Sequence, residues 1–173
     1  IQSMLNISAE DVAESAAQAI RLEKSGCEII RAAVPTLDDV KLIPTLKEAV
    51  NIPVVADIHF DYRIALACAE AGVDKIRINP GNIGSPDRVK AVADACRKRN
   101  IPIRIGVNSG SLEKSLLEKY GSPTPEALVE SALGHVKLLN DCDFDDIVIS
   151  IKSSDVKLMI AAYRLLAQQV DYP

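Results

Sequence analysis

The sequence predicts an α/β protein of the TIM-type (β/α)8 barrel class, with about six of the eight βα units in one partial domain, residues 1–173. The first observation is that short apolar segments alternate six times with helix-like segments. The expected strands start near residues 1, 28, 53, 75, 103 and 146, and most of these spacings suit one strand plus one helix. A complete barrel typically needs about 250 residues. A doubly wound parallel sheet is the alternative with the same alternation.

The second observation is a local pattern that occurs twice. A glycine that can end a helix stands five residues before an arginine inside an apolar strand. The two copies are Gly26 with Arg31 and Gly72 with Arg77. This recurrence favours a chain built from one repeated strand–helix unit.

The first three units follow from apolar runs and from residues that start or stop helices. Ser8 and Asp11 have the spacing of a capping box at the start of the first helix. Pro44 falls inside the second helix, and Asp61 caps the third, which Gly72 ends. The expected strands cover residues 2–6, 27–34 and 54–59, and the expected helices cover residues 8–25, 38–50 and 61–71.

The last three units include two distinctive connections. Residues 79–84 are expected to continue neither a strand nor a helix, because they contain Pro80 and two glycines. Ser85 and Pro86 then start a helix, and the connection over residues 109–124 is long. All strands are apolar rather than alternating, as in a parallel sheet covered on both faces. The expected strands cover residues 75–78, 103–108 and 146–152, and the expected helices cover residues 86–98, 124–140 and 156–170.

Four of the expected strands each carry one basic residue. A buried cation needs a partner because its desolvation is costly, and Asp57 alone cannot neutralise four of them. If these side chains point into the mouth of the barrel, their natural counter-ion is a ligand with several negative charges. The planar fork of arginine suits phosphate, so we expect a diphosphate site. The alternative is that the cations point outward and pair with acidic residues on the helices. The four residues are Arg31, Arg77, Arg104 and Lys152.

Polar residues near the ends of the strands are further candidates for the site. Asparagines in the adjacent loops could donate amide hydrogen bonds to the same ligand, although asparagine also suits turns for conformational reasons. Asp57 and His59 end the third strand and could transfer protons or hold a substrate hydroxyl, or else cap the next helix. His135 lies in the middle of a helix and is interpreted as structural. The three asparagines are Asn79, Asn82 and Asn108.

Lys152 also admits a different enzyme class. A lysine on the sixth strand of a barrel can form a Schiff base if desolvation lowers its pKa. The protein would then be a class I aldolase that acts on a phosphorylated substrate. A pterin-binding barrel is another alternative by architecture, and a non-catalytic phosphate-binding module is the non-enzyme alternative.

Composition argues against several classes of function. A net charge of −4 and an aromatic content of 3% argue against binding to nucleic acid or to anionic membranes. No apolar run has the length of a membrane span. Because no CxxC pair exists, we expect buried, reduced thiols in a cytoplasmic protein and no metal site. We also expect the chain, which starts at Ile1 rather than methionine, to be an excerpt of a longer protein. The cysteines are Cys27, Cys68, Cys96 and Cys142.

Four long segments carry a resemblance to a known family. They are VVADIHFDYRIAL (54–66), KIRINPGNIG (75–84), IPIRIGVNSGSLEK (101–114) and YGSPTPEALVESAL (120–133). These segments resemble the barrel domain of the 4-hydroxy-3-methylbut-2-enyl diphosphate synthase family. The resemblance implies an oxidoreductase that reductively opens 2-C-methyl-D-erythritol 2,4-cyclodiphosphate in the non-mevalonate pathway of isoprenoid biosynthesis. It also implies contacts with the substrate diphosphate from Arg31, Arg77, Arg104, Lys152 and Asn108.

The same resemblance implies a cofactor and partners. Members of the family use a [4Fe-4S] cluster, held by three cysteines and a glutamate of a separate C-terminal domain. Ferredoxin or flavodoxin supplies the electrons, and in the homodimer the cluster domain of one subunit covers the barrel of the other. The cluster motif and the last two barrel strands are absent from this sequence. We therefore expect this chain to bind the diphosphate but not to catalyse the reduction alone.

Overall fold

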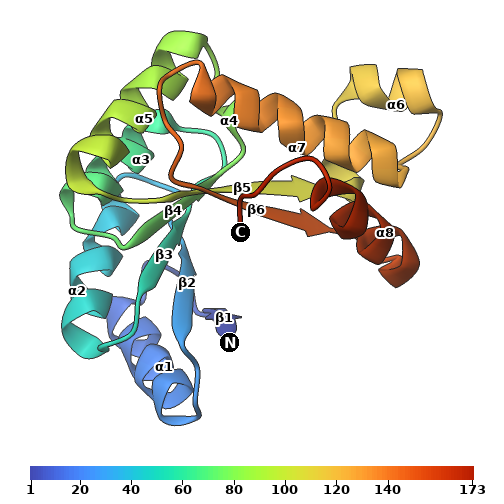
Figure 1. Cartoon of the computed structure of the whole chain (residues 1–173). Coiled ribbons are helices and arrows are strands. Elements are labelled where there is room, and N and C mark those ends of the chain that lie inside the picture. Colours follow the sequence, from blue (N-terminus) through green and yellow to red (C-terminus); the bar gives the residue numbers. More distant parts are fainter.

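The computed structural model describes residues 1–173, and its centre is a sheet of six parallel strands (Figure 1). The order in the sheet is β1-β2-β3-β4-β5-β6, so neighbours along the chain are neighbours in space. A doubly wound sheet would instead reverse its strand order at a switch point. The prediction of a partial TIM-type barrel is therefore confirmed. The strands are β1 (Gln2–Met4), β2 (Ile29–Ala33), β3 (Val54–Asp57), β4 (Lys75–Ile78), β5 (Ile103–Asn108) and β6 (Ile147–Lys152).

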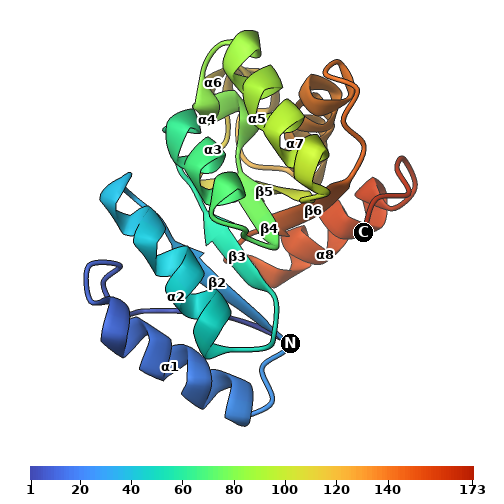
Figure 2. The same ribbon diagram turned by 90° about the vertical axis from the view of Figure 1, so that its left-hand side faces the viewer.

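The helices lie outside a strongly curled sheet, which makes an open half-barrel. In Figure 1 the strand direction turns from β2 and β3 to β5 and β6, and Figure 2 shows helices in front of the strands on the outer side. None of the helices is both long enough and apolar enough to cross a bilayer. The helices are α1 (Val12–Lys24), α2 (Leu42–Ala49), α3 (Tyr62–Glu70), α4 (Pro80–Ile83), α5 (Pro86–Arg99), α6 (Lys114–Tyr120), α7 (Pro125–Asn140) and α8 (Val156–Leu166), with 3-10 turns η1 (Asp38–Lys41) and η2 (Ser109–Ser111).

The expected strands and helices are all present, and the main differences in bounds are the end of α8, at Leu166 rather than near residue 170, and the start of α1. The side chain of Asp11 accepts a hydrogen bond from the backbone N–H of Glu14, so Asp11 is the N-cap and α1 begins at Val12. The predicted helix start at Ser8 is therefore wrong. Pro44 lies in the first turn of α2, where a missing backbone N–H is tolerated.

Two short helices lie where the sequence predicts only loops. Within residues 79–84, Asn79 Oδ1 accepts a hydrogen bond from the N–H of Gly81 at 3.0 Å, and the intervening proline takes the first helical position. The same residues that end β4 thus start α4. Gly84 ends α4 with a φ of 114°, a conformation that favours glycine. The other short helix, α6, lies in the long connection over residues 109–124.

On β2, β4 and β6 buried residues alternate with half-exposed ones, so the expectation of strands covered on both faces is wrong for these strands and holds only for β3, which is buried throughout. On β4, Ile76 and Ile78 are fully buried, whereas Lys75 and Arg77 between them are only half-buried. The buried positions pack under the helices in one hydrophobic core. Because the half-barrel is open, its inner face is not filled by layers of apolar side chains as in a complete barrel. Polar side chains can therefore occupy that inner face.

Candidate functional site

The register of the strands brings the strand cations to the inner face of the half-barrel. In a parallel pair, residues opposite each other share one face of the sheet, and so do residues two apart on one strand. Asp57 is opposite Arg77, and Arg77 is opposite Arg104. Arg31 stands two residues before Ala33, which is opposite Asp57. Three arginines and one aspartate from four neighbouring strands therefore share this face.

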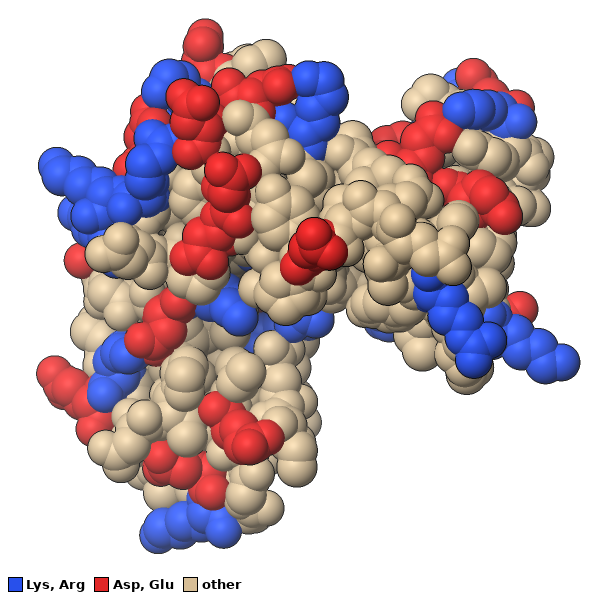
Figure 3. Space-filling model, in the orientation of Figure 1, with Lys and Arg blue, Asp and Glu red and all other residues tan.

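A cavity of about 560 Å³ opens on the inner face and collects most of the predicted site residues. In Figure 3, Lys and Arg atoms lie at the inner corner between the part of the molecule with β2, β3, α1 and α2 and the part with β5, β6, α7 and α8. The outward orientation of the cations, the alternative considered above, is not observed. The basic residues that line the cavity are Arg31, Arg77, Arg104 and Lys152. Other polar lining residues are His59, Asn79, Asn82, Asn108, Ser111, Ser150 and Tyr163.

Asp57 lies beneath the cavity and holds two of the arginines. Its side chain is buried, and its Oδ2 accepts hydrogen bonds from Nε and Nη2 of Arg31. Its Oδ1 accepts a hydrogen bond from Nη1 of Arg77 at 3.1 Å. One carboxylate thus orients two guanidinium groups and neutralises only one of them. Since Asp57 does not line the cavity, this geometry supports a role in placing the arginines rather than in direct contact with a substrate.

Arg104 is the arginine of the cavity without a carboxylate partner. Its Nη1 donates a hydrogen bond to the neutral side chain of Gln2, to Oε1 at 3.0 Å. Burial lowers the pKa of Arg104 below its ordinary value, and the nearby charges of Arg31 and Arg77 lower it further. The fold therefore holds a positive charge at a point where an anion would be favourable.

Gly106 on β5 leaves the space in which Arg77 lies. A Cβ atom at Gly106 would stand 2.3 Å from both Nε and Nη2 of Arg77. Nη2 of Arg77 also donates a hydrogen bond to the carbonyl oxygen of Gly106 at 3.3 Å. Gly106 is not among the predicted site residues. A glycine inside a strand pattern, which often marks a close approach, is the feature that could have identified it.

Four residues predicted near the strand ends reach the cavity, namely His59, Asn79, Asn82 and Asn108, and two of them also stabilise turns. Asn79 and Asn108 each accept, through the side-chain oxygen, a hydrogen bond from the N–H of the glycine two residues later, at 3.0 and 3.1 Å. Their side-chain NH₂ groups remain available to donate to a ligand. His59 is exposed, with its ring centroid 6.1 Å from that of Phe60.

The remaining hydroxyl residues of the cavity are not predicted by the sequence. Ser150 Oγ donates a hydrogen bond to the carbonyl oxygen of Ile105 at 3.1 Å. The hydroxyl oxygen of Tyr163, on α8, accepts a hydrogen bond from the N–H of Ile151 at 2.9 Å. Ser111 follows β5 in the turn η2. Isolated hydroxyl residues have no spacing that distinguishes a site from ordinary polar positions, so only the fold identifies them.

Lys152 lies at the exposed end of β6. It lines the cavity and stands opposite Asn108 in the register of β5 and β6. A Schiff-base lysine needs surroundings that remove water from its amine. The exposed position of Lys152 provides no such surroundings, so the structure does not favour the aldolase alternative.

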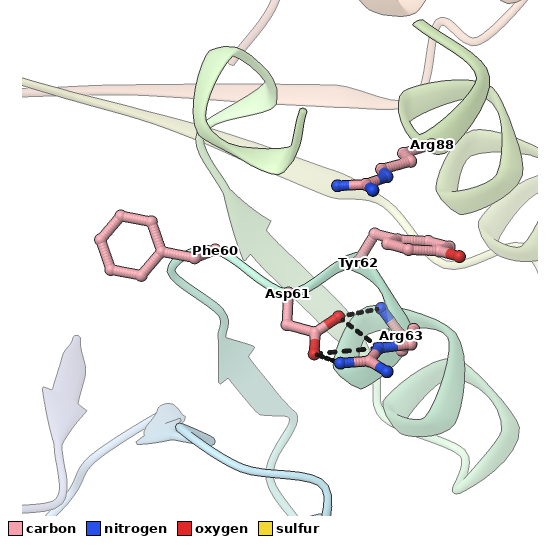
Figure 4. A pocket seen from close by; sticks show the side chains of 5 residues that line it. All are labelled: Phe60, Asp61, Tyr62, Arg63 and Arg88. Atoms are coloured by element: carbon pink, nitrogen blue, oxygen red, sulfur yellow. Dashed lines mark hydrogen bonds and ion pairs between the residues drawn. The ribbon is translucent and has the colours of Figure 1, made fainter. Parts of the chain in front are cut away.

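A second hollow, of about 420 Å³, lies between the loop after β3 and the start of α5 (Figure 4). Asp61 pairs with Arg63, and the guanidinium of Arg88 lies 5.3 Å from the centre of the Tyr62 ring. Phe60 points away from these four side chains (Figure 4). Asp61 neutralises Arg63, so this hollow has one cation without a carboxylate partner, Arg88, whereas the inner face has four cations for one carboxylate. The cavity of the inner face, with its unneutralised cations, is therefore the better candidate for binding an anionic ligand.

The residues of this chain do not fit a [4Fe-4S] cluster. A cluster needs several thiolates close together, and a thiol must lose its proton before it binds metal. Burial raises the pKa of the Cys68 and Cys96 thiols to about 12. Across the whole described chain, no three His, Cys, Asp or Glu residues lie close enough together to hold a metal ion.

Comparison with known proteins gives matches over the whole chain. The family model described as the GcpE TIM-barrel domain matches residues 1–173. A relative from Pseudomonas paraeruginosa, named 4-hydroxy-3-methylbut-2-en-1-yl diphosphate synthase (flavodoxin), is 60% identical over 173 residues, which are 100% of this chain and 47% of the relative. A relative of the same name from Clostridium perfringens is 58% identical over 173 residues, again 100% of this chain and 50% of the relative. The chain thus spans about half the length of these curated relatives.

Solved structures give the same fold at much lower sequence identity. Dihydropteroate synthase from Yersinia pestis has a TM-score of 0.66 at 15% identity, covering 96% of this chain and 63% of that structure's chain. Phospho-2-dehydro-3-deoxyheptonate aldolase from Thermotoga maritima has a TM-score of 0.67 at 14% identity, covering 99% and 49%. At such low identity these likenesses show the fold alone. On its match over residues 1–173, the chain belongs to the GcpE TIM-barrel domain family.

Proposed function

We propose that this chain is the substrate-binding barrel of a 4-hydroxy-3-methylbut-2-en-1-yl diphosphate synthase of isoprenoid biosynthesis. In this proposal the cavity holds the diphosphate of 2-C-methyl-D-erythritol 2,4-cyclodiphosphate. The observation that carries the proposal is the set of four strand cations around one cavity, with the single carboxylate of Asp57 beneath them. The excess of positive charge suits a ligand with two ionised phosphate groups. The names of the relatives support a diphosphate as the product, 4-hydroxy-3-methylbut-2-en-1-yl diphosphate.

Each residue has a proposed role that follows from its position. Arg31 and Arg77, oriented by Asp57, donate paired hydrogen bonds to the phosphate oxygens. Arg104 supplies the charge that no carboxylate neutralises. Lys152, at the end of β6, supplies an exposed cation at the mouth. Further donors to the substrate are His59, Asn79 and Asn108.

The proposed reaction is a reduction, and the reducing group lies outside the residues of this chain. A [4Fe-4S] cluster would supply the electrons, and the relatives' names support flavodoxin as the donor to it. Since the present residues form no cluster site, their proposed work is to bind and orient the diphosphate. We also propose a cytoplasmic homodimer, with the cluster in a further C-terminal domain, and no reduction by this chain alone.

Neutralising Lys152 in the full-length enzyme tests the proposed function. The Lys152→Gln substitution removes one cation from the mouth without breaking an ion pair, so the fold should remain intact. We expect kcat/KM for the cyclic diphosphate to fall about tenfold, the scale of one charge-assisted hydrogen bond. Steady-state kinetics with reduced flavodoxin would measure the change.

The matched control is Lys114→Gln, because the Lys114 side chain is 91% exposed and lies outside the cavity. This control should leave kcat/KM unchanged. Equal kinetics for Lys152→Gln and the wild type would contradict the proposal. A borohydride-trapped adduct on Lys152 would support the aldolase alternative instead.

A further inference from the structure

A buried histidine lies behind the loops that line one side of the cavity. His135, in the middle of α7, is 4% exposed, and its Nε2 lies 2.9 Å from Oε1 of Glu113. Ser131, one turn earlier on α7, donates a hydrogen bond to the same oxygen at 2.9 Å. Two residues of α7 therefore lie against the Glu113 carboxylate, and Ser131 is hydrogen-bonded to it.

Glu113 connects this helix to one of the loops. It is the N-cap residue of α6, and it follows the turn that carries the cavity residues Asn108 and Ser111. The neighbouring His135 imidazole is the main cause that lowers the pKa of Glu113 to about 2, and the Ser131 hydroxyl contributes. The carboxylate is therefore ionised at neutral pH, and its contacts with α7 fix where the turn ends.

The His135 ring also limits how α4 is placed. A Cβ atom at Gly81 would stand 2.7 Å from Cε1 of His135, closer than real Cβ atoms come to any neighbour. The backbone of Gly81 has no positive φ, so alanine would be acceptable there apart from this ring. Gly81 stands between Asn79 and Asn82, which both line the cavity. The close approach of Gly81 to His135 thus sets the distance between residues 79–84 and α7.

We propose that His135 is a positioning residue for diphosphate binding. Together with Glu113 it fixes, from behind the cavity, the two loops that carry Asn79, Asn82 and Asn108. This inference rests on the proposed function of the cavity and goes beyond it, because His135 itself touches no ligand. A histidine that only fills the core would affect stability, whereas a positioning residue also determines ligand affinity at temperatures where the protein stays folded.

A double-substitution cycle on Gly81 and His135 tests the inference in the full-length protein. Gly81→Ala pushes α4 away from the ring, and we expect about tenfold weaker calorimetric binding of the cyclic diphosphate, within the range known for small displacements of a site. In the His135→Ala background the added methyl group has room. There, Gly81→Ala should cause no further loss of affinity.

The matched control is Gly134→Ala, beside His135 on α7, where an added Cβ has no heavy atom within 4 Å. It should bind as tightly as the wild type. If His135→Ala does not fold, His135→Asn frees part of the same space and retains a polar side chain. The inference is overturned if Gly81→Ala leaves the affinity unchanged, or weakens it by the same factor in both backgrounds.

Hydrogen exchange of the ligand-free protein separates this inference from the proposed function. Amides of residues 79–84 should exchange faster in His135→Ala than in the wild type, because the loop loses its support. Unchanged exchange overturns the positioning role. If the wild type does not bind the cyclic diphosphate, the proposed function fails together with the ligand-binding part of the inference. Faster exchange in His135→Ala would then still show that His135 stabilises residues 79–84.

Discussion

At the residue scale, one buried carboxylate decides where two cations of the cavity lie. Asp57 is 1% exposed, and the side chains of its partners Arg31 and Arg77 are 22% and 18% exposed. Asp57→Asn keeps the shape of the side chain but leaves two neighbouring guanidinium groups without a counter-charge. We expect the free energy of unfolding, measured by urea denaturation, to fall by about 3 kcal/mol.

An exposed pair of the same chemistry is the control for that prediction. Asp61 pairs with Arg63 on the surface, and asparagine can cap α3 as aspartate does. Asp61→Asn should therefore change the stability much less, because water screens the pair. Similar losses from the two substitutions would show that the burial of Asp57 has no energetic consequence.

Gly106 gives a second prediction at this scale. In Gly106→Ala the methyl group would take the space of the Arg77 guanidinium, which is the flexible end of its side chain and can move. We expect about tenfold weaker binding of the cyclic diphosphate with a change in stability of less than about 1 kcal/mol. Calorimetry and thermal unfolding measure the two quantities, with Gly134→Ala as the control. Unaltered affinity would mean that the position of Arg77 is not important for binding.

At the scale of elements, the contact of Glu113, at the start of α6, with α7 should lose its stabilising effect in acid. The pKa of Glu113 is lowered from 4.5 to about 2, so the stability that this carboxylate contributes is present above pH 4.5 and is lost as the pH falls towards 2. Allowing for solvent screening of a half-buried group, we expect a contribution of about 1 to 2 kcal/mol.

Unfolding experiments between pH 6 and pH 2 measure this contribution as a difference between proteins. The stability advantage of the wild type over Glu113→Gln should shrink as the pH falls through this range. Glu118→Gln, on the exposed side of α6, should show no such trend. If the difference in stability between the wild type and Glu113→Gln does not change with pH, the ionised Glu113 carboxylate is not the source of that stability.

The elements that the sequence predicts are formed by patterns within one segment, whereas the elements that it does not predict depend on other parts of the chain. Long amphipathic helices and apolar strands depend on periodicity, which is visible in one segment, and all of them are present, although the start of α1 and the end of α8 differ from the prediction. Short helices such as α4 and α6 depend on caps and on contacts with other elements. The contact of Gly81 with His135 joins residues far apart in the chain, so no local pattern announces it.

At the scale of the whole molecule, the cations are visible in the sequence but their environment is not. Their presence on four strands indicates an anionic ligand, whereas their inward direction needs the register of the sheet. Arg104 and its partner Gln2 are 102 residues apart, and Asp57 meets two arginines from different strands. The alternating burial of β2, β4 and β6 follows from the open half-barrel, which the apolar composition of the strands does not indicate.

The central claim is that the strand cations are held for an anionic ligand, and Arg104 tests it most directly. This residue has no carboxylate partner, and burial together with Arg31 and Arg77 lowers its pKa. Neutralising it should therefore weaken binding and relieve repulsion in the empty protein, as expected of a functional residue that costs stability.

The measurement is calorimetric titration of the full-length wild type and Arg104→Gln with the cyclic diphosphate at two salt concentrations, with unfolding curves of both ligand-free proteins. Arg99→Gln, at the exposed end of α5, is the control. We predict salt-sensitive binding, a loss of at least about tenfold in affinity for Arg104→Gln, and equal or higher stability of this variant without ligand. Undiminished affinity, or a less stable empty protein, would contradict the claim that Arg104 is held in place for the ligand.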